Sequence, residues 1–396
     1  MKLKIAILGT RGIPNHYGGY EQAVSFLSPA LVKKGHQVTV YNSHNHPYQE
    51  KTWRGVEIIH CKDPENRLGT AGQFIYDLNC ILDARKQDYD VIMLMGYTSS
   101  SVWGKLYPKK SVIISNMDGL EWSRSKYSKP VRRFLHYAES LAVKHSDFYI
   151  ADSPGIQSYL KTTYQIESTY IPYGAVVYQK KDEGVLNEFN IQPCKYYLLI
   201  SRMEPENNIE TILDGYCKSN STLKFLVIGN VGNKHGQYLI KKFSHNDNII
   251  FAGAIFDQKK LHNLKSFCKL YFHGHSVGGT NPSLLEAMAS CASISAHNNP
   301  FNKSVLGNDA AWFSNAEDVK NIINSPVVSR NSSMVCNNLK KIQDHYSWEL
   351  ITEQYENFII DCWNRKRNEQ TDFNKRQPGK QDQLLPAGRP SHYTTV

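Results

Sequence analysis

The chain alternates short apolar runs with amphipathic helical patterns, and this alternation constrains the fold more than any other feature. In the first half the apolar runs lie at residues 5–8, 38–40, 56–60, 91–95, 112–115 and 148–151. Helical patterns lie between most of them, notably at residues 20–34 and 130–145. Pro29, inside the first of these helices, predicts a kink or a late break.

The second half repeats the same alternation. Its apolar runs lie at residues 197–200, 225–229, 249–251 and 270–272, with helical patterns at 208–218, 234–243 and 282–289. Alternating strands and helices predict parallel sheets that are covered by helices on both faces. The expected fold class is therefore α/β, with two Rossmann-like, doubly wound parallel-sheet domains that face each other across a cleft.

The same pattern predicts the domain limits. We expect an N-terminal domain at residues 1–178 and a second domain at residues 194–345, joined by a polar linker. A helix at residues 346–364 is expected to pack back on the N-terminal domain. Residues 365–396 bury too little apolar surface to offset the entropy of ordering, so we expect a disordered basic tail there.

Composition limits the expected location and partners. No window approaches the roughly 20 apolar residues that span a bilayer, and the N-terminus lacks the apolar region of a signal peptide, which predicts a cytoplasmic protein. The eight cysteines are scattered and are expected to be small buried side chains. Residues 105–144 hold nine basic and three acidic residues. This surface suits anionic partners such as lipid headgroups, or is simply a solvated face.

The first loop with a candidate chemical role follows the strand at residues 5–8 and opens a helix. It ends in Gly18 and Gly19. Glycine lets backbone N–H groups approach a phosphate, and a helix N-terminus supplies positive potential. The loop lacks the G-x-G-x-x-G dinucleotide fingerprint. Alternatively, its glycines serve only the turn.

A second loop of this kind precedes the helix at residues 282–289. Gly278, Gly279, Thr280 and Asn281 would direct backbone N–H groups and a hydroxyl at a diphosphate. Glu286 lies one turn inside the helix, where its two oxygens match the vicinal hydroxyls of a ribose. The alternative is a glutamate on a helix face that binds no ligand.

The end of this helix carries a resemblance to a known family. Glu286-Ala287-Met288-Ala289 resembles the second half of the E-x7-E donor-binding signature of retaining GT-B glycosyltransferases in the sucrose-synthase and mannosyltransferase superfamily. Residues 278–283 are similar to a rhamnosyltransferase-like subgroup, and residues 9–14, 17–21 and 116–122 fit the same subgroup. The resemblance covers residues 3–360 and implies the GT-B fold and glycosyl transfer with retention of configuration. The first acidic residue of the signature is absent, because Gly278 stands in its place.

Members of this superfamily bind the donor diphosphate with an Arg and, five residues later, a Lys. Arg202 matches the Arg, whereas Asn207 stands at the Lys position and contributes no charge. The resemblance therefore assigns the leaving diphosphate to Arg202, with Arg11 or backbone N–H groups in support. A surface salt bridge is the alternative role of Arg202.

Asp118 follows the strand at residues 112–115 and should lie at the carboxyl edge of the first sheet, together with Glu121. We assign Asp118 to orient an acceptor hydroxyl and Trp122 to stack on a sugar ring. A helix-capping aspartate is the alternative. Three histidines are further candidates for the cleft, or are ordinary polar groups: His16, His273 and His275.

The implied reaction transfers a hexose from a nucleoside-diphosphate sugar to an acceptor hydroxyl. The expected acceptor is a bacterial surface polysaccharide, such as capsule or lipopolysaccharide, or an undecaprenyl-diphosphate-linked glycan. Asp118, Arg202 and Glu286 are the expected catalytic residues. The absence of a carboxylate at position 278 favours a 6-deoxy sugar, with dTDP-L-rhamnose as the first expectation and a UDP-hexose as the alternative. Contact with the inner leaflet of the membrane is also expected.

No metal or other cofactor is expected, because no Asp-x-Asp pair stands where a metal-bound diphosphate would need it. Three other functions stay open. A non-catalytic partner of another transferase would explain Gly278 and Asn207, and a sugar-nucleotide epimerase shares the two-domain cleft. A nucleic-acid-binding protein is suggested by charge alone, but the chain lacks a recognition motif, so we expect no nucleic-acid partner.

Overall fold

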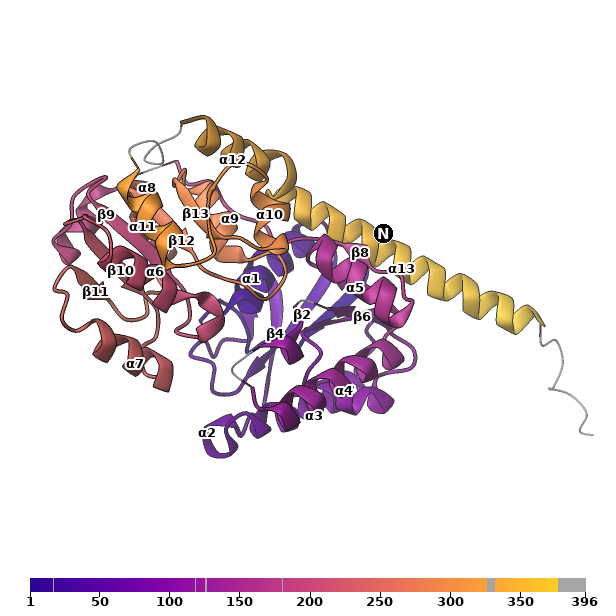
Figure 1. Ribbon diagram of the computed structural model, residues 1–396. Helices are drawn as coiled ribbons and strands as arrows, with labels where there is room; N and C mark the ends of the chain where they lie inside the picture. Colours follow the sequence, from indigo (N-terminus) through magenta and orange to yellow (C-terminus); the bar gives the residue numbers. More distant parts are fainter. Residues whose placement is uncertain (17, 118, 125–126, 180, 326–331, 377–396) are drawn as a thin grey trace, which may run out of the picture.

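The computed structural model describes residues 1–16, 18–117, 119–124, 127–179, 181–325 and 332–376, and Figure 1 shows two α/β domains. Each domain is built on its own sheet, with helices on both faces. The predicted fold class, two doubly wound parallel-sheet domains, is therefore confirmed.

The N-terminal domain contains an eight-stranded sheet in the order β3-β4-β2-β1-β5-β6-β7-β8. Its strands are β1 Lys4–Leu8, β2 Gln37–Ser43, β3 Thr52–Trp53, β4 Val56–Cys61, β5 Val91–Met95, β6 Val112–Asn116, β7 Phe148–Ala151 and β8 Thr169–Tyr170. Only the β3–β4 pair is antiparallel. The chain builds outwards from β1 and then returns to β5 on the other side of β1. The loops after β1 and β5 therefore meet at a switch point, where α/β sheets bind ligands.

Helices cover both faces of this sheet. They are α1 Gly19–Lys33, α2 Glu65–Leu68, α3 Ala71–Ala84, α4 Lys129–His145 and α5 Pro154–Tyr164, with short 3-10 turns η1 Ser101–Leu106 and η2 Glu121–Ser123. Ile5 and Ile7 of β1 pack with Leu27 of α1, whereas Ala6 and Leu8 pack with α3. Because successive strand residues point to opposite faces, α1 and α3 lie on opposite sides of the sheet.

Pro29 does not interrupt α1. The helix continues to Lys33, so the predicted late break is wrong. Leu27 and Leu31, which flank Pro29, are buried against the sheet. This packing offsets the one backbone hydrogen bond that proline cannot make.

The second domain contains a six-stranded parallel sheet in the order β11-β10-β9-β12-β13-β14. Its strands are β9 Tyr196–Ile200, β10 Lys224–Ile228, β11 Ile249–Phe251, β12 Leu270–His273, β13 Ile294–His297 and β14 Ala311–Phe313. The chain again builds outwards from β9 and returns to β12 beside it. The loops after β9 and β12 carry Arg202 and Gly278, so both lie at the switch point of this sheet.

The helical elements of the second domain complete its two outer layers. They are η3 Glu183–Phe189, η4 Pro205–Asn207, α6 Ile209–Cys217, α7 Lys234–Phe243, α8 Gln258–Phe267, α9 Pro282–Ala289, α10 Pro300–Leu306, α11 Ala316–Asn324 and α12 Ser332–His345. No described helix has a stretch long and apolar enough to cross a bilayer.

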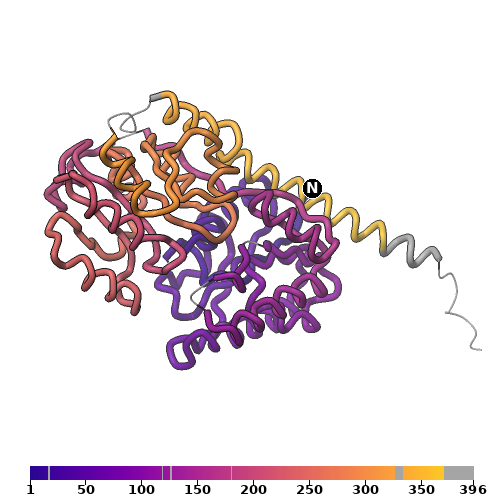
Figure 2. Tube along the Cα trace, in the orientation of Figure 1, coloured from indigo at the N-terminus to yellow at the C-terminus, as the bar shows by residue number. Residues whose placement is uncertain are grey.

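The last helix, α13 Trp348–Arg376, crosses from the second domain to the N-terminal domain (Figure 2). Its Glu356 pairs with Lys34 at 2.7 Å. Further along, Lys366 pairs with Asp147 and donates to the Ser111 carbonyl at 2.8 Å. Residues 365–376 continue α13, whereas the sequence predicted disorder from residue 365. Residues 377–396 lie outside the described part of the chain.

Candidate active site between the two domains

The loop after β1 is held in place by side chains of its own domain. A Cβ atom at Gly12 (φ +120°) would lie 2.2 Å from Cγ of Asn42, so this position requires glycine. The Asn42 amide accepts from Ile13 N at 3.0 Å and donates to Ile13 O at 2.8 Å. These contacts fix the backbone at Gly12 and Ile13 without any ligand.

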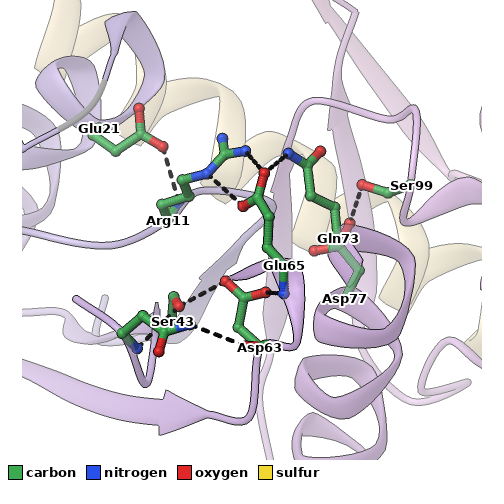
Figure 3. A network of polar contacts seen from close by, with 9 residues as sticks. Arg11, Glu21, Ser43, Asp63, Glu65, Gln73, Asp77 and Ser99 are labelled. Carbon is green, nitrogen blue, oxygen red and sulfur yellow. Dashed lines mark hydrogen bonds and ion pairs between the residues drawn. The ribbon is translucent and has the colours of Figure 1, made fainter. Parts of the chain in front are cut away.

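Arg11 of this loop points toward an acidic partner (Figure 3). Its guanidinium donates two hydrogen bonds to the Glu65 carboxylate, at 2.7 and 3.0 Å. Burial opposes ionisation of Glu65, but the hydrogen bonds from Arg11 and Gln73 lower the pKa of this carboxyl. The suggested supporting role of Arg11 at a diphosphate would require it to give up this bidentate pair.

The N-termini of α1 and α9 face each other across the domain boundary. A Cβ atom at Gly19, the first residue of α1, would lie 3.6 Å from Cγ of Pro282, the first residue of α9. Gly18 precedes α1 and offers no side-chain cap to it. The uncapped start of α1 offers backbone N–H groups, whereas α9 begins with Pro282, which has no N–H, and its Ser283 N–H is already bound by Asn281. Both helix ends carry a partial positive charge, which favours an anion between them.

The loop before α9 contains both open and tightly packed positions. Gly278 has φ +123°, and nothing lies within 4 Å of a Cβ atom built there. At Gly279 a Cβ atom would lie 1.7 Å from Oδ1 of Asp152, so only glycine fits. The buried Thr280 hydroxyl donates to the Asp152 carbonyl at 2.5 Å, and Asn281 caps α9 by accepting from Ser283 N at 2.9 Å. Thr280 and Asn281 therefore shape the loop, and the N–H groups at 278 and 279 remain the candidates for a phosphate.

Glu286 lies at the boundary between the domains, and side chains of both domains contact its carboxylate. Lys265 of α8 pairs with one carboxylate oxygen, and the Gln22 amide of α1 donates to the other at 2.5 Å. The Lys265 side chain is only 1% exposed. Sequence reasoning identified Glu286 but missed both partners, because neither lies near it along the chain.

The pocket at Glu286 is narrow in this structure. Its walls come from α1, the stretch after β8, α8, α9 and the start of α13, and include Phe26, Tyr178, His262 and Trp348. The enclosed volume is about 20 Å³, which suffices for a water molecule but not for a ribose. Ribose binding at Glu286 would require the pocket to open locally, with Gln22 leaving the carboxylate.

Arg202 is exposed, and its guanidinium has no hydrogen bond or ion pair among the described residues. It is close enough to His275 to contribute to the low pKa of that ring, after burial and His273. Asn207 is buried instead, and its amide donates to the Arg202 carbonyl at 2.7 Å. Asn207 thus fixes the backbone of this loop, and Arg202 is the cation that is available to a ligand.

The loop after β6 approaches the second domain. Asp118 itself lies outside the described residues. Its neighbour Gly119 lies beside Gly278, because a Cβ atom at Gly119 would be 3.8 Å from Cα of Gly278. Arg124 binds Glu121 at 2.6 Å and reaches Glu206 of the second domain at 3.7 Å, an ion pair between the domains that the sequence did not indicate.

Trp122 packs within the N-terminal domain. Its ring lies 5.3 Å from His136 in an edge-on arrangement and 6.1 Å from Tyr159. The predicted stacking of Trp122 on a sugar ring would have to use whatever part of the ring these contacts leave exposed.

The three candidate histidines occupy different surroundings. His16 stacks on Phe256 of the second domain, with 5.9 Å between ring centroids. His273 and His275 stack on each other at 4.5 Å. Burial lowers the pKa of His273 to about 3 and that of His275 well below its ordinary value, so both rings are neutral at pH 7.

Two regions of the chain match known families. Residues 2–176 match the family described as "Domain of unknown function (DUF1972)", and residues 187–327 match "Glycosyl transferases group 1". No curated protein matches the chain in sequence.

Solved structures with the same arrangement of domains are glycosyltransferases. Sucrose-phosphate synthase from Thermosynechococcus elongatus has a TM-score of 0.77 at 16% identity, over 92% of this chain and 100% of that chain. HepE from Anabaena in complex with UDP-glucose has a TM-score of 0.70 at 14% identity, over 91% and 100%. WaaG, a glycosyltransferase involved in lipopolysaccharide biosynthesis, has a TM-score of 0.64 at 13% identity, over 90% and 99%.

At these identities the structural likeness establishes the fold, and the family match establishes the kind of domain. The fold likeness and the family match are both consistent with the topology, in which each sheet has a switch point. Residues 187–327 form a group 1 glycosyl transferase domain, and the chain is a glycosyltransferase enzyme with the two-domain GT-B fold.

Proposed function

We propose that this chain transfers a hexose from a nucleoside-diphosphate sugar to a hydroxyl of a growing surface polysaccharide or lipid-linked glycan, with retention of anomeric configuration. The observation that carries the proposal is the meeting of the N-termini of α1 and α9, at Gly19 and Pro282, on the boundary between the two sheets. Arg202 supports it from the loop after β9, where it lies close to His275. Such an arrangement stabilises a diphosphate as negative charge grows on it during departure.

The proposed roles follow the chemistry of the transfer. Arg202 and the N–H groups of Gly278 and Gly279 stabilise the departing diphosphate. Glu286 binds the ribose hydroxyls once Gln22 has released it. Retention fits a reaction in which an oxygen of the departing diphosphate accepts the proton of the attacking hydroxyl.

Asp118 is proposed to orient the acceptor. The closeness of Gly119 to Gly278 supports a role for this loop beside the reacting sugar. Holding the acceptor hydroxyl near the anomeric carbon converts an encounter in solution into a reaction within one complex, which lowers the barrier by an entropic route.

The donor proposed first is dTDP-L-rhamnose, and a UDP-hexose is the second candidate. The open space at Gly278 supports a sugar with fewer hydroxyl contacts, such as a 6-deoxy sugar. The UDP-hexose candidate is supported by the HepE structures, which contain UDP, UDP and glucose, or UDP-glucose.

Incubation with each donor, followed by separation of nucleotides, tests the proposal. A transferase releases nucleoside diphosphate, and release rises when a lipid-linked glycan acceptor is added. A non-catalytic partner protein releases nothing from any donor, and an epimerase changes the sugar while the nucleotide stays attached. Either of these results would replace the proposed function.

We also propose that transfer needs no divalent metal, because Arg202 and two helix N-termini meet the charge of the diphosphate. Activity is then expected to be the same in EDTA as in Mg²⁺. A loss in EDTA that Mg²⁺ or Mn²⁺ restores would contradict this part of the proposal.

The acceptor is proposed to lie at the inner face of the plasma membrane. The exposed basic side chains of the region from residue 105 to 144 support contact with anionic lipid there.

A further inference from the structure

Two histidines at the end of β12 bury ring nitrogens that no hydrogen bond satisfies. Both nitrogens of His273 and Nδ1 of His275 are buried without a hydrogen-bond partner among the described residues. Buried polar atoms in folded proteins nearly always have a partner, so each exception needs an explanation. His273 is the last residue of the strand and is 1% exposed, whereas His275 lies in the loop and is half-buried. Of the two rings, that of His275 is therefore the one a ligand can reach.

The backbone around His275 is fixed by contacts to two other loops. The Asn299 amide, which follows β13, donates to the His275 carbonyl at 3.0 Å. The next residue, Ser276, donates to the Glu206 carbonyl through its N–H at 3.0 Å and through its hydroxyl at 2.8 Å. Glu206 belongs to the loop after β9, which also carries Arg202. A side chain on a backbone held in this way has a defined position before a ligand arrives, which lowers the entropic cost of binding.

The ring of His275 is held as well. It stacks on His273 with 4.5 Å between the ring centroids and 17° between the ring planes. Its second nitrogen, Nε2, forms no hydrogen bond with any described residue and, unlike Nδ1, is accessible. The Nε2 edge of an otherwise fixed ring is thus available to a ligand.

The surroundings place this ring beside the candidate donor site. Burial is the main cause of the low pKa of His275, and the stacked imidazole and the charges of Arg202 and Arg124 add to it. Three residues after His275, nothing lies within 4 Å of a Cβ atom built at Gly278. Gly119 of the loop after β6 lies against the same Gly278. His275 is therefore close to the place where Arg202 and the loop of the N-terminal domain come together.

We propose that Nε2 of His275 forms a hydrogen bond with a hydroxyl of the transferred sugar. A hydroxyl both donates and accepts, so it can pair with this nitrogen in either tautomer of a neutral ring. A phosphate oxygen only accepts, and the Arg202 guanidinium and the loop N–H groups match it better. The open space at Gly278 leaves room for a sugar next to the ring. The inference rests on the proposed function, because it requires a nucleotide sugar in the cleft.

Paired titrations of a nucleoside diphosphate and of the corresponding nucleotide sugar test this contact. UDP is compared with UDP-glucose, and dTDP with dTDP-L-rhamnose, in the native chain and in His275→Phe. The variant keeps an aromatic ring that can stack on His273 and removes both nitrogens. We expect its affinity for the nucleotide sugar to fall about fivefold, the factor for one lost hydrogen bond, while its affinity for the diphosphate stays the same.

Two amide variants identify the nitrogen that makes the contact. The amide of glutamine reaches the position of Nε2, whereas the shorter asparagine reaches that of Nδ1. His275→Gln should therefore restore most of the affinity for the nucleotide sugar, and His275→Asn should bind as His275→Phe does. The exposed His245 provides the matched control, since His245→Phe should bind both ligands as the native chain does. Unfolding midpoints in urea verify that each variant is folded.

The assignment is overturned if His275→Phe weakens the diphosphate and the nucleotide sugar by the same factor, because the ring would then act on the diphosphate or on the loop. It is also overturned if neither affinity changes, or if His275→Asn restores binding and His275→Gln does not. A native chain that binds none of the four ligands contradicts the proposed function, and the contact falls with it. A native chain that binds them, with His275→Phe unaffected, contradicts this inference alone.

Discussion

The Glu286 carboxylate depends on a buried cation. Lys265 lies 1% exposed in α8 with its ammonium on Glu286, whose own side chain is 19% exposed. Removing one member of such a pair leaves the other charge without compensation in a place that water hardly reaches. Lys265 therefore orients the Glu286 carboxylate, and Glu286 supplies the negative charge that stabilises the buried Lys265 ammonium.

Glu286→Gln should accordingly lower the free energy of unfolding by about 3 kcal/mol, because the Lys265 ammonium stays buried without a counter-charge. The double variant Glu286→Gln/Lys265→Met should be closer to the native chain, since it removes both charges. Urea unfolding of the three chains measures this. If the double variant is as unstable as the sum of the two single variants, the two residues do not act as a pair.

His273 gives a second prediction at this scale. Both of its ring nitrogens are buried without a hydrogen-bond partner among the described residues, and burial lowers its pKa to about 3. The unfolded chain takes up a proton near pH 6.5 and the folded chain does not, so stability is lost as pH falls from about 6.5 toward 3, by at most about 1.4 kcal/mol per pH unit.

His273→Phe should make the fall of stability between pH 7 and pH 5 shallower and should cost little at pH 7, because the ring nitrogens bond to nothing. The exposed His245 provides the control, since His245→Phe should leave the slope as it is. Unfolding midpoints in urea at several pH values measure both. An unchanged slope in His273→Phe would contradict the assignment of a neutral, unpaired ring.

Some site residues could be predicted from the sequence and others could not, for a physical reason. Arg202 and Gly278 could be predicted, because each follows a recognisable apolar strand in a loop of a familiar pattern. Gln22 and Arg124 could not, because their roles depend on how the two domains meet, and Lys265 could not, because its role depends on how α8 packs against α9. A single sequence carries no signal for such long-range pairing.

At the scale of elements, the pairing of α1 with α9 governs access to Glu286. Gln22, one turn into α1, occupies one carboxylate oxygen, and the pocket around it has room for about one water. A ribose that binds Glu286 must therefore displace the Gln22 amide.

Gln22→Ala should raise the affinity for a nucleoside-diphosphate sugar roughly fivefold, since the donor no longer competes with a hydrogen bond worth about 1 kcal/mol. Gln258→Ala is the control, because Gln258 lines the same pocket without bonding Glu286. Fluorescence or calorimetric titration measures the dissociation constants. A weaker donor affinity in Gln22→Ala would mean that Gln22 contacts the donor directly.

The elements that sequence reasoning found are those with a strong pattern of their own. The central strands β1, β5, β9 and β10 are continuous apolar runs and were predicted nearly to the residue. The short strands β8 and β13 have few apolar residues in a row and were not predicted. The strand β14 is apolar but only three residues long, and it was missed as well. The helix α13 also extends past residue 365, where Lys366 pairs with Asp147 of the N-terminal domain, a contact that local composition cannot reveal.

At the scale of the whole molecule, contacts between the domains surround the candidate site. The Thr280 hydroxyl bonds the Asp152 carbonyl, Arg124 reaches Glu206, and His16 stacks on Phe256. Each contact joins one domain to the other at or near a sheet switch point. The described conformation is therefore a closed one, and donor binding at Glu286 requires at least a local opening.

Calorimetric titration of UDP and dTDP into the native chain and into Arg202→Ala tests the central claim most directly. The account predicts that the native chain binds at least one of these diphosphates and that Arg202→Ala binds it about 10- to 100-fold more weakly, the loss of a hydrogen-bonded charge. The exposed Lys218→Ala should bind as the native chain does. Equal affinity in Arg202→Ala, or no binding of either diphosphate, would contradict the account.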